Sequence, residues 1–195
     1  MQFDINQLNT IIRERRSVFV RQYDAGKRVD DRIIEQMLEN ANWAPTHKLT
    51  EPWRFTVFTG DGLNTFARLQ ASIYRNTAGT AFKEDNYQKL LTNPLTASHI
   101  ISIGMKRHAA ANIPEFEEIA AVACAVQNMY LTATVYNVGC YWTTGGVTNV
   151  QAARPFFDLG PEDKLMGFLY VGVIAVPSAP GTRKPVSQKI KWIRS

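Results

Sequence analysis

The sequence has few of the residues that mark the common catalytic and metal-binding motifs. Its 195 residues include two cysteines and three histidines, and they contain neither HExxH nor CxxC. A metal site is therefore not expected. There is no GxSxG turn for a serine nucleophile, and no Walker A loop or GxGxxG motif for a nucleotide phosphate. If the chain is an enzyme, its chemistry is expected to come from a bound cofactor.

Cysteine is too scarce for a disulfide framework, since only Cys124 and Cys140 are present. Both lie in apolar surroundings, so they are predicted to be reduced residues of the core. The first residues, Met-Gln-Phe-Asp-Ile, lack the basic stretch and the apolar run of a secretory signal. Together these features predict a cytoplasmic protein.

Acidic residues are missing from residues 164–195, which hold six basic residues. The whole chain carries 22 Lys and Arg against 17 Asp and Glu, a formal charge of +5. Residues 1–163 are nearly balanced, so the excess charge belongs to the C-terminal segment. A broad basic surface for nucleic acid is therefore not predicted, although the tail could contact a single phosphate. A nucleic-acid or interaction module built on this tail is the weakest functional hypothesis.

Charged side chains are also absent from residues 119–153. The most apolar window, 119–138, is interrupted by polar residues, so a membrane-spanning helix is not predicted. These polar residues are Gln127, Asn128, Thr132, Thr134 and Asn137. A helix that is apolar all round in a soluble protein is buried on every side. This pattern predicts a central helix, placed between two copies of the chain in a dimer.

The order of the predicted elements favours an α+β fold in a single domain, residues 1–195. Helical periodicity and capping residues predict helices at 4–15, 30–44, 63–74, 114–137 and 150–157. Runs of β-forming residues predict strands at 53–59, 100–105 and 165–175. Strict β-α-β alternation is absent, which argues against a doubly wound sheet. Two connecting segments are interpreted as a mobile lid with a short helix and as a turn, at 75–98 and 139–146.

Four segments carry groups suited to ligand binding, and each also has a plain structural explanation. Arg13–Ser17 offers guanidinium groups to a phosphate, or is a solvated helix end. Residues 44–53 form a loop that could present functional groups, or a helix stop before a packed Trp. Gly139–Gly146 offers backbone amides to a planar ring, or is a helix cap and turn. Residues 183–185, Arg-Lys-Pro, contact a ligand or belong to a solvated tail.

Taken in order, these segments resemble the nitroreductase family of flavin mononucleotide (FMN) enzymes. The resemblance covers nearly the whole chain. It begins with Arg-Arg-Ser at 15–17, Ala-Pro-x-His-Lys-x-x-x-Pro-Trp at 44–53 and Gly-x-x-Trp at 139–142. It continues with Gly-Phe-Leu-Tyr-x-Gly at 167–172 and Arg-Lys-Pro at 183–185. The sequence is most similar in look to the small bacterial nitroreductases, which carry the same His-Lys pair.

The resemblance implies a central, mostly antiparallel sheet flanked by helices. It also implies an intertwined homodimer with FMN at the interface, in which the charge-free helix lies at the dimer core. Residues 177–195 would form an extended arm that reaches the partner subunit. Three prolines in this segment, Pro177, Pro180 and Pro185, agree with an extended chain.

The resemblance also implies which basic residues hold the cofactor. Arg15, Arg16 and Ser17 would bind the FMN phosphate, the ribityl chain and the pyrimidine edge. Arg183 and Lys184 of the arm would close on the phosphate. The chemistry is consistent, because a phosphate with nearly two negative charges is matched by several cations and a hydroxyl group.

Five further residues are implied to surround the flavin ring. Trp43 and His47 would approach it from the other protomer. Trp142, Thr143 and Thr144 would lie along the ring, with backbone amides near its reactive edge. Many relatives carry Arg-Ser where this chain has the two threonines, so one cation near the flavin is missing.

The implied reaction uses NADPH or NADH as the reductant and a small electron-poor acceptor, such as a nitroaromatic or a quinone. In this ping-pong scheme hydride passes to the flavin before the acceptor enters the same pocket. It needs no protein nucleophile or base, so no catalytic acid or base is assigned. Leu49 and Glu51 replace the Asn and Gln of many relatives. They motivate an alternative: a flavin-binding or flavin-processing protein of the same fold without reductase turnover.

Overall fold

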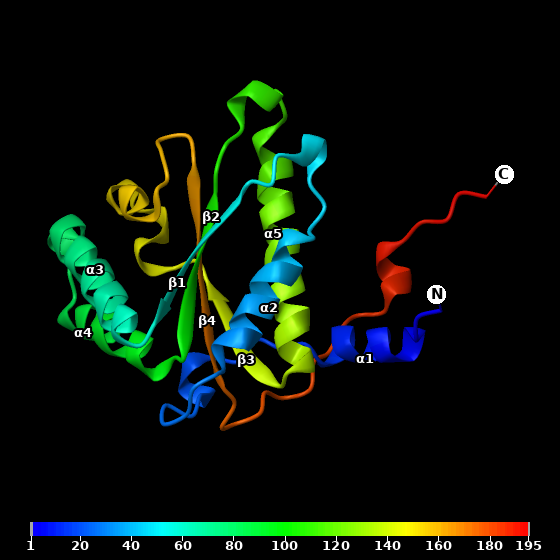
Figure 1. Cartoon of the computed structure of the whole chain (residues 1–195), viewed down its shortest axis with the longest axis horizontal. Coiled ribbons are helices and arrows are strands. Elements are labelled where there is room, and N and C mark those ends of the chain that lie inside the picture. The colour runs from blue at the N-terminus through cyan, green and yellow to red at the C-terminus, as the bar shows by residue number, and fades with distance from the viewer. Residues whose placement is uncertain (1, 195) are drawn as a thin grey trace.

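A four-stranded antiparallel sheet with the strand order β1-β2-β4-β3 forms the centre of the protein (Figure 1). The computed structural model describes residues 2–194, apart from the side chain of residue 111. The strands are β1 Trp53–Thr59, β2 His99–Met105, β3 Val138–Thr143 and β4 Lys164–Val173. The α-helices are α1 Ile5–Glu14, α2 Asp31–Asn42, α3 Asp61–Thr77, α4 Glu84–Thr92 and α5 Glu115–Val135. The predicted α+β class and antiparallel sheet are confirmed.

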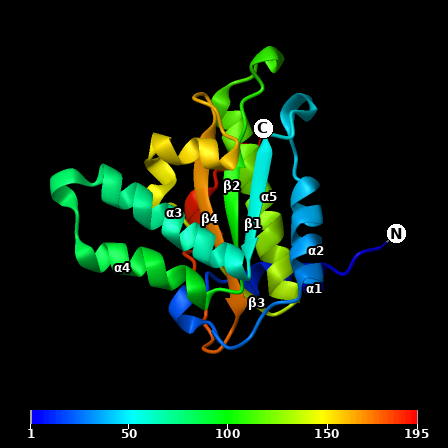
Figure 2. The same ribbon diagram turned by 60° about the vertical axis from the view of Figure 1, so that its left-hand side comes forward.

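Helices cover both faces of the sheet, so the protein has a hydrophobic core on each side (Figure 2). α2 and α5 pack on one face, where Met37 and Val122 join Ile101 of β2 in one buried cluster. α3 packs on the other face, where the ring centroids of Phe66 and Phe168 lie 4.8 Å apart. Because helices lie on both sides, every residue of β2 is buried.

Two helices begin at aspartates, as the sequence predicted. The Asp4 carboxylate accepts a hydrogen bond from the Asn6 backbone amide at 2.8 Å, which caps α1. The Asp30 carboxylate accepts one from Arg32 at 2.9 Å and caps α2. Each bond satisfies an amide that has no partner within its own helix. Local chemistry therefore fixes both helix starts.

The segment Gly139–Gly146 is not the turn that the sequence predicted, because most of it forms β3. This strand pairs with β4 over its whole length, with Trp142 opposite Leu169. One of the glycines that suggested a turn, Gly139, instead makes room for a ring together with Gly172 of β4. A Cβ atom at Gly139 would lie 2.9 Å from the Tyr23 ring, and one at Gly172 would lie 2.5 Å from it. The chain turns only after the strand ends.

Within one chain the long helix α5 is buried on one side, and its burial between two copies of the chain stays a prediction. The sheet and α2 cover one side of it. The opposite side presents a stripe of exposed residues at helical spacing, called here the α5 stripe. The stripe consists of Phe116, Ala120, Cys124, Gln127 and Val135. Cys124 is therefore exposed rather than part of the core, whereas Cys140 is buried as predicted.

The predicted lid at 75–98 contains α4, which forms a helical hairpin with α3. The Gln70 side-chain amide joins the two helices by donating to the carbonyl of Leu90 at 2.7 Å. The helix is thus confirmed, and the mobility of the segment stays a prediction. The predicted helix near 150–157 is a 3-10 helix, Gln151–Phe157.

The described part of the C-terminal arm forms one 3-10 turn, Val186–Lys189, and is otherwise free of helix and strand. It lies on the same side of the molecule as α1, away from the sheet (Figure 1). Among the described residues 2–194, no helix is both long enough and apolar enough to cross a membrane.

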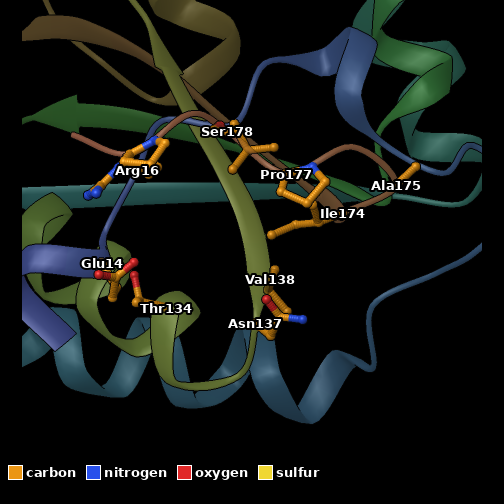
Figure 3. Close-up of a pocket in the computed structure, with 11 residues that line it drawn as sticks. Glu14, Arg16, Thr134, Asn137, Val138, Ile174, Ala175, Pro177 and Ser178 are labelled. Atoms are coloured by element: carbon orange, nitrogen blue, oxygen red, sulfur yellow. The ribbon is translucent and has the colours of Figure 1, made fainter. Parts of the chain in front are cut away.

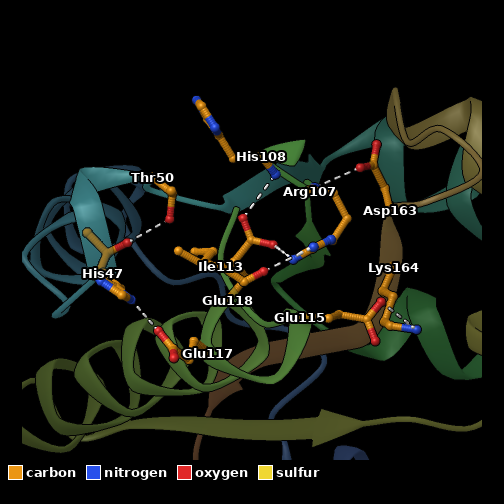
Figure 4. Close-up of polar contacts among 11 residues, drawn as sticks. His47, Thr50, Arg107, His108, Ile113, Glu115, Glu117, Glu118, Asp163 and Lys164 are labelled. Carbon is orange, nitrogen blue, oxygen red and sulfur yellow. Dashed lines mark hydrogen bonds and ion pairs between the residues drawn. The ribbon is translucent and has the colours of Figure 1, made fainter. Parts of the chain in front are cut away.

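Charged side chains anchor the N-terminal end of α5 (Figure 4). The Glu118 carboxylate is fully buried and forms an ion pair with Arg107. It also accepts a hydrogen bond from the His108 backbone amide at 2.9 Å. Asp163 accepts one from the Arg107 backbone amide at 2.8 Å. Burying a carboxylate is costly unless it is paired and hydrogen-bonded, so these partners fix α5 against the ends of β2 and β4.

Replacing Glu118 with Ala should destabilise the protein by about 3 kcal/mol, because Arg107 loses its partner inside the protein. Glu115→Ala is the matched control, since this acid lies one turn away in a half-exposed pair with Lys164. That change should cost at most about 1 kcal/mol. Urea unfolding at neutral pH measures both variants. Equal losses would show that the buried pair contributes no more than a surface pair.

Candidate functional site

A cavity of about 620 Å³ lies where the C-terminal end of α1 meets the arm. Four arginines and one carboxylate are among its lining side chains: Arg13, Glu14, Arg15, Arg16 and Arg183. Gln127 of the α5 stripe and the Pro180-Gly181 segment complete part of its wall. The surplus of guanidinium groups makes this cavity suited to a phosphate or another anion.

A second cavity of about 370 Å³ adjoins the first and shares Glu14 and Arg16 with it. Figure 3 shows Glu14 beside Thr134 of α5, and Arg16 on the side of the arm with Ser178. The two cavities together form a polar hollow around the end of α1. Apolar residues, including Ile174 and Pro177, form the far wall of the second cavity.

The arm is fastened to the end of α1 by hydrogen bonds. The Arg16 guanidinium donates to the carbonyl of Ala179 in the arm at 3.2 Å. It also donates to the carbonyls of Arg13 and Arg15 at the end of α1. The Ser178 hydroxyl donates to the carbonyl of Ser17 at 3.1 Å. These contacts hold the arm along the cavity. Arg183, only a few residues farther on, is thereby brought to the same cavity as Arg15 and Arg16.

The arm passes close to Arg16 at Gly181, where a side chain would displace the Arg16 guanidinium. A Cβ atom at Gly181 would lie 2.8 Å from Cζ of Arg16. Lys184, which the sequence placed at the same site, is exposed. It does not line the cavity, and its carbonyl accepts a hydrogen bond from the Lys189 ammonium at 3.2 Å.

Arg15 lies over an aromatic ring that the sequence did not single out. Its Cζ is 5.3 Å from the centroid of Tyr130, a cation–π distance. The Tyr130 hydroxyl accepts a hydrogen bond from the Trp142 backbone amide at 2.7 Å. Burial is the main reason that the pKa of Tyr130 is raised, and its hydrogen bonds with Ser17 and Trp142 partly oppose this. The phenol therefore keeps its proton at neutral pH.

Trp142, Thr143 and Thr144 lie at the end of β3 rather than in a turn. The Trp142 indole donates to the carbonyl of Met166 at 3.0 Å. Thr143 is half-buried and Thr144 is exposed. The strand lies very close to β4 here, because a Cβ atom at Gly167 would be 2.2 Å from the Thr143 carbonyl oxygen. Gly167 has φ +123°, which also favours glycine.

Trp43 and His47 lie far from the arginines within one chain. His47 Nδ1 is 2.5 Å from Glu117 at the N-terminal end of α5 (Figure 4). Trp43 is 78% exposed, and its indole donates to Glu39 at 3.0 Å. Glu117 and Tyr130 are thirteen residues apart on α5, about 20 Å along its axis. A single chain therefore does not bring the two residue groups into one site.

No group of three or more His, Cys, Asp or Glu residues within residues 2–194 is placed to hold a metal ion. The ligand-binding chemistry of the described chain is that of guanidinium groups, hydroxyls and backbone amides. This donor set fits a phosphorylated organic ligand better than a bare cation.

Comparison with known proteins identifies the family. The model of the "Nitroreductase family" matches residues 12–173 of the chain. YdjA of Escherichia coli strain K12, which its name assigns to the NAD(P)H nitroreductases, is 26% identical over 152 residues. That alignment covers 78% of this chain and 81% of YdjA.

Solved structures agree with the observed fold. A nitroreductase-like family protein from Bacillus cereus has a TM-score of 0.81 at 23% identity, with all of both chains covered. A protein from Desulfovibrio desulfuricans, described as a nitroreductase in complex with FMN, has a TM-score of 0.71 at 25% identity. It is covered to 99% and this chain to 100%. Since the family model spans most of its length, the chain belongs to the nitroreductase family.

Proposed function

We propose that this protein is an FMN-dependent oxidoreductase that takes hydride from NAD(P)H. It passes the electrons to nitroaromatic, quinone or similar electron-poor acceptors by a ping-pong mechanism. The observation that carries the proposal is the cavity at which Arg15, Arg16 and Arg183 meet. It is supported by the relative named as a NAD(P)H nitroreductase and by the similar structure that contains FMN.

The cavity passes a simple chemical test for the FMN phosphate, which carries close to two negative charges. The described residues that line it include four arginines and only one acidic residue, Glu14. Guanidinium groups form paired hydrogen bonds with phosphate oxygens. The glycine at position 181 leaves the arm close to the cavity without a side chain in the way.

Each residue of the site has a role that follows from its position. Arg15 and Arg183 would bind the phosphate, and Arg16 would keep the arm closed over it. The end of β3 at Trp142 would support the flat part of the cofactor. The chemistry supplied by bound FMN is the acceptance of hydride and the release of electrons to the acceptor. The protein's own task is to bind and orient the reactants and to exclude water.

Removing one arginine tests the site. Arg183→Ala should weaken FMN binding about tenfold, the scale of one charge-assisted hydrogen bond. Arg194→Ala removes the same charge farther along the arm and should change binding by about twofold or less. Titration of the flavin-free protein with FMN, followed by flavin fluorescence, measures both. Equal losses would indicate general attraction by the tail, and no loss would remove Arg183 from the site.

Reductase turnover is what separates the proposal from a flavin-binding or flavin-processing protein of the same fold. The loop residue Leu49 is 80% exposed and Glu51 has φ +43°, so the loop that departs from relatives is also strained. Anaerobic mixing of the FMN-loaded protein with NADPH or NADH should bleach the flavin absorbance, and a quinone should restore it. A flavin that stays oxidised with both reductants would favour the alternative.

The protein is further proposed to act as a homodimer with FMN at the interface. α1 is amphipathic, yet none of its residues Ile5–Glu14 is buried within the described chain. The α5 stripe is exposed as well, with Phe116 at 68% and Val135 at 62%. Two unpartnered apolar surfaces on neighbouring helices are typical of an interface. A second copy would also supply Trp43 and His47, which one chain leaves distant from the arginines.

A charge in the α5 stripe should separate the dimer. Ala120→Glu is expected to shift the species from twice the 22.0 kDa chain mass to one chain and to weaken FMN binding. Asn64→Glu places the same group on the exposed side of α3 and should leave both unchanged. Light scattering gives the mass, and circular dichroism checks the fold. A dimer that tolerates Ala120→Glu would contradict this interface.

A further inference from the structure

Tyr130 of α5 touches residues from separate parts of the proposed cofactor site. Its ring lies under the Arg15 guanidinium at 5.3 Å, at the end of α1. Its hydroxyl accepts the backbone N–H of Trp142 on β3 at 2.7 Å. The residue itself is only 7% exposed. One buried side chain thus joins a proposed phosphate ligand to the strand end proposed to support the flavin ring.

We propose that Tyr130 is a positioning residue of the cofactor site, which fixes Arg15 and the Trp142 backbone in one geometry. The proposal rests on the proposed FMN site, and Tyr130 acts through these neighbours rather than by touching the cofactor. A long arginine side chain loses conformational freedom when it binds an anion. Because the ring already holds the guanidinium in place, part of that loss occurs before FMN arrives.

The hydroxyl of Tyr130 gives the Trp142 backbone a buried partner. A backbone N–H can only donate, so the Trp142 amide uses a lone pair of the phenol oxygen. β3 is also tied to the segment after α1, because the Val18 amide donates to the Cys140 carbonyl at 2.8 Å.

Tyr130→Phe tests the hydroxyl and keeps the ring under Arg15. FMN binding to the flavin-free protein should weaken about five- to tenfold, since the Trp142 amide loses its acceptor. Tyr23→Phe is the matched control. Tyr23 is equally buried, and its hydroxyl donates to a single backbone carbonyl, that of Tyr170, at 3.0 Å. It should bind FMN within about twofold of the wild type, although both changes remove a buried hydrogen bond.

A double-mutant cycle tests the ring. Arg15→Ala should weaken FMN binding in the wild type, and its effect should shrink about threefold or more in Tyr130→Leu, where the guanidinium is already loose. The effect of Arg15→Ala should be unchanged in the Tyr23→Phe background. If Tyr130 only stabilised the fold, this coupling would not appear, because the effects of Arg15→Ala and Tyr130→Leu on FMN affinity would be independent.

The outcomes separate the two proposals. A wild type that takes up no FMN would overturn the proposed function and the role of Tyr130 with it. A wild type that binds FMN while Tyr130→Phe binds equally well would overturn only the positioning role. Arg15→Ala effects that are equal in both backgrounds would do the same for the ring. If Tyr130→Leu fails to fold, the comparison of Tyr130→Phe with Tyr23→Phe decides alone.

Discussion

The burial of α5 is the constraint on which the rest of the structure depends. A stretch without charge, residues 119–153, must be covered on all sides or leave apolar surface in water. The sheet and α2 cover one side, and the buried Glu118 pair fixes its first turn. The α5 stripe is left exposed by a single chain. Every feature of the proposed site is placed relative to this helix.

The positive charge of the cavity comes from arginine side chains rather than from a helix N-terminus. Helix N-termini often bind phosphate through free amides. None of the described residues that line this cavity belongs to the first turn of a helix. The cavity adjoins instead the C-terminal end of α1, whose partial negative charge favours the nearby arginines. This partial charge stabilises the cluster of positive charges before a ligand binds. The arm adds Arg183 to the same cluster.

Local chemistry predicted much of this fold, and distant contacts decided the rest. Asp4 and Asp30 cap helices through hydrogen bonds to residues two positions farther along the chain, so the local sequence was sufficient to predict both helix starts. Strand β3 was missed because Gly139 is required by its contact with the Tyr23 ring, which lies more than a hundred residues away in the chain. Tyr130 was missed for the same reason: its partners, Arg15 and Trp142, meet only in the folded protein.

The separation of the two residue groups along α5 is compatible with one specific arrangement of the proposed dimer. Most small oligomers have a two-fold axis, and the same surface of each copy then meets itself. If two α5 stripes meet across an axis perpendicular to the helices, the helices run antiparallel. The Glu117 end of one copy would then lie beside the Tyr130 end of the other. His47 of each copy would approach the Arg15 of its partner, so the contact proposed to bury α5 would also complete two equivalent sites.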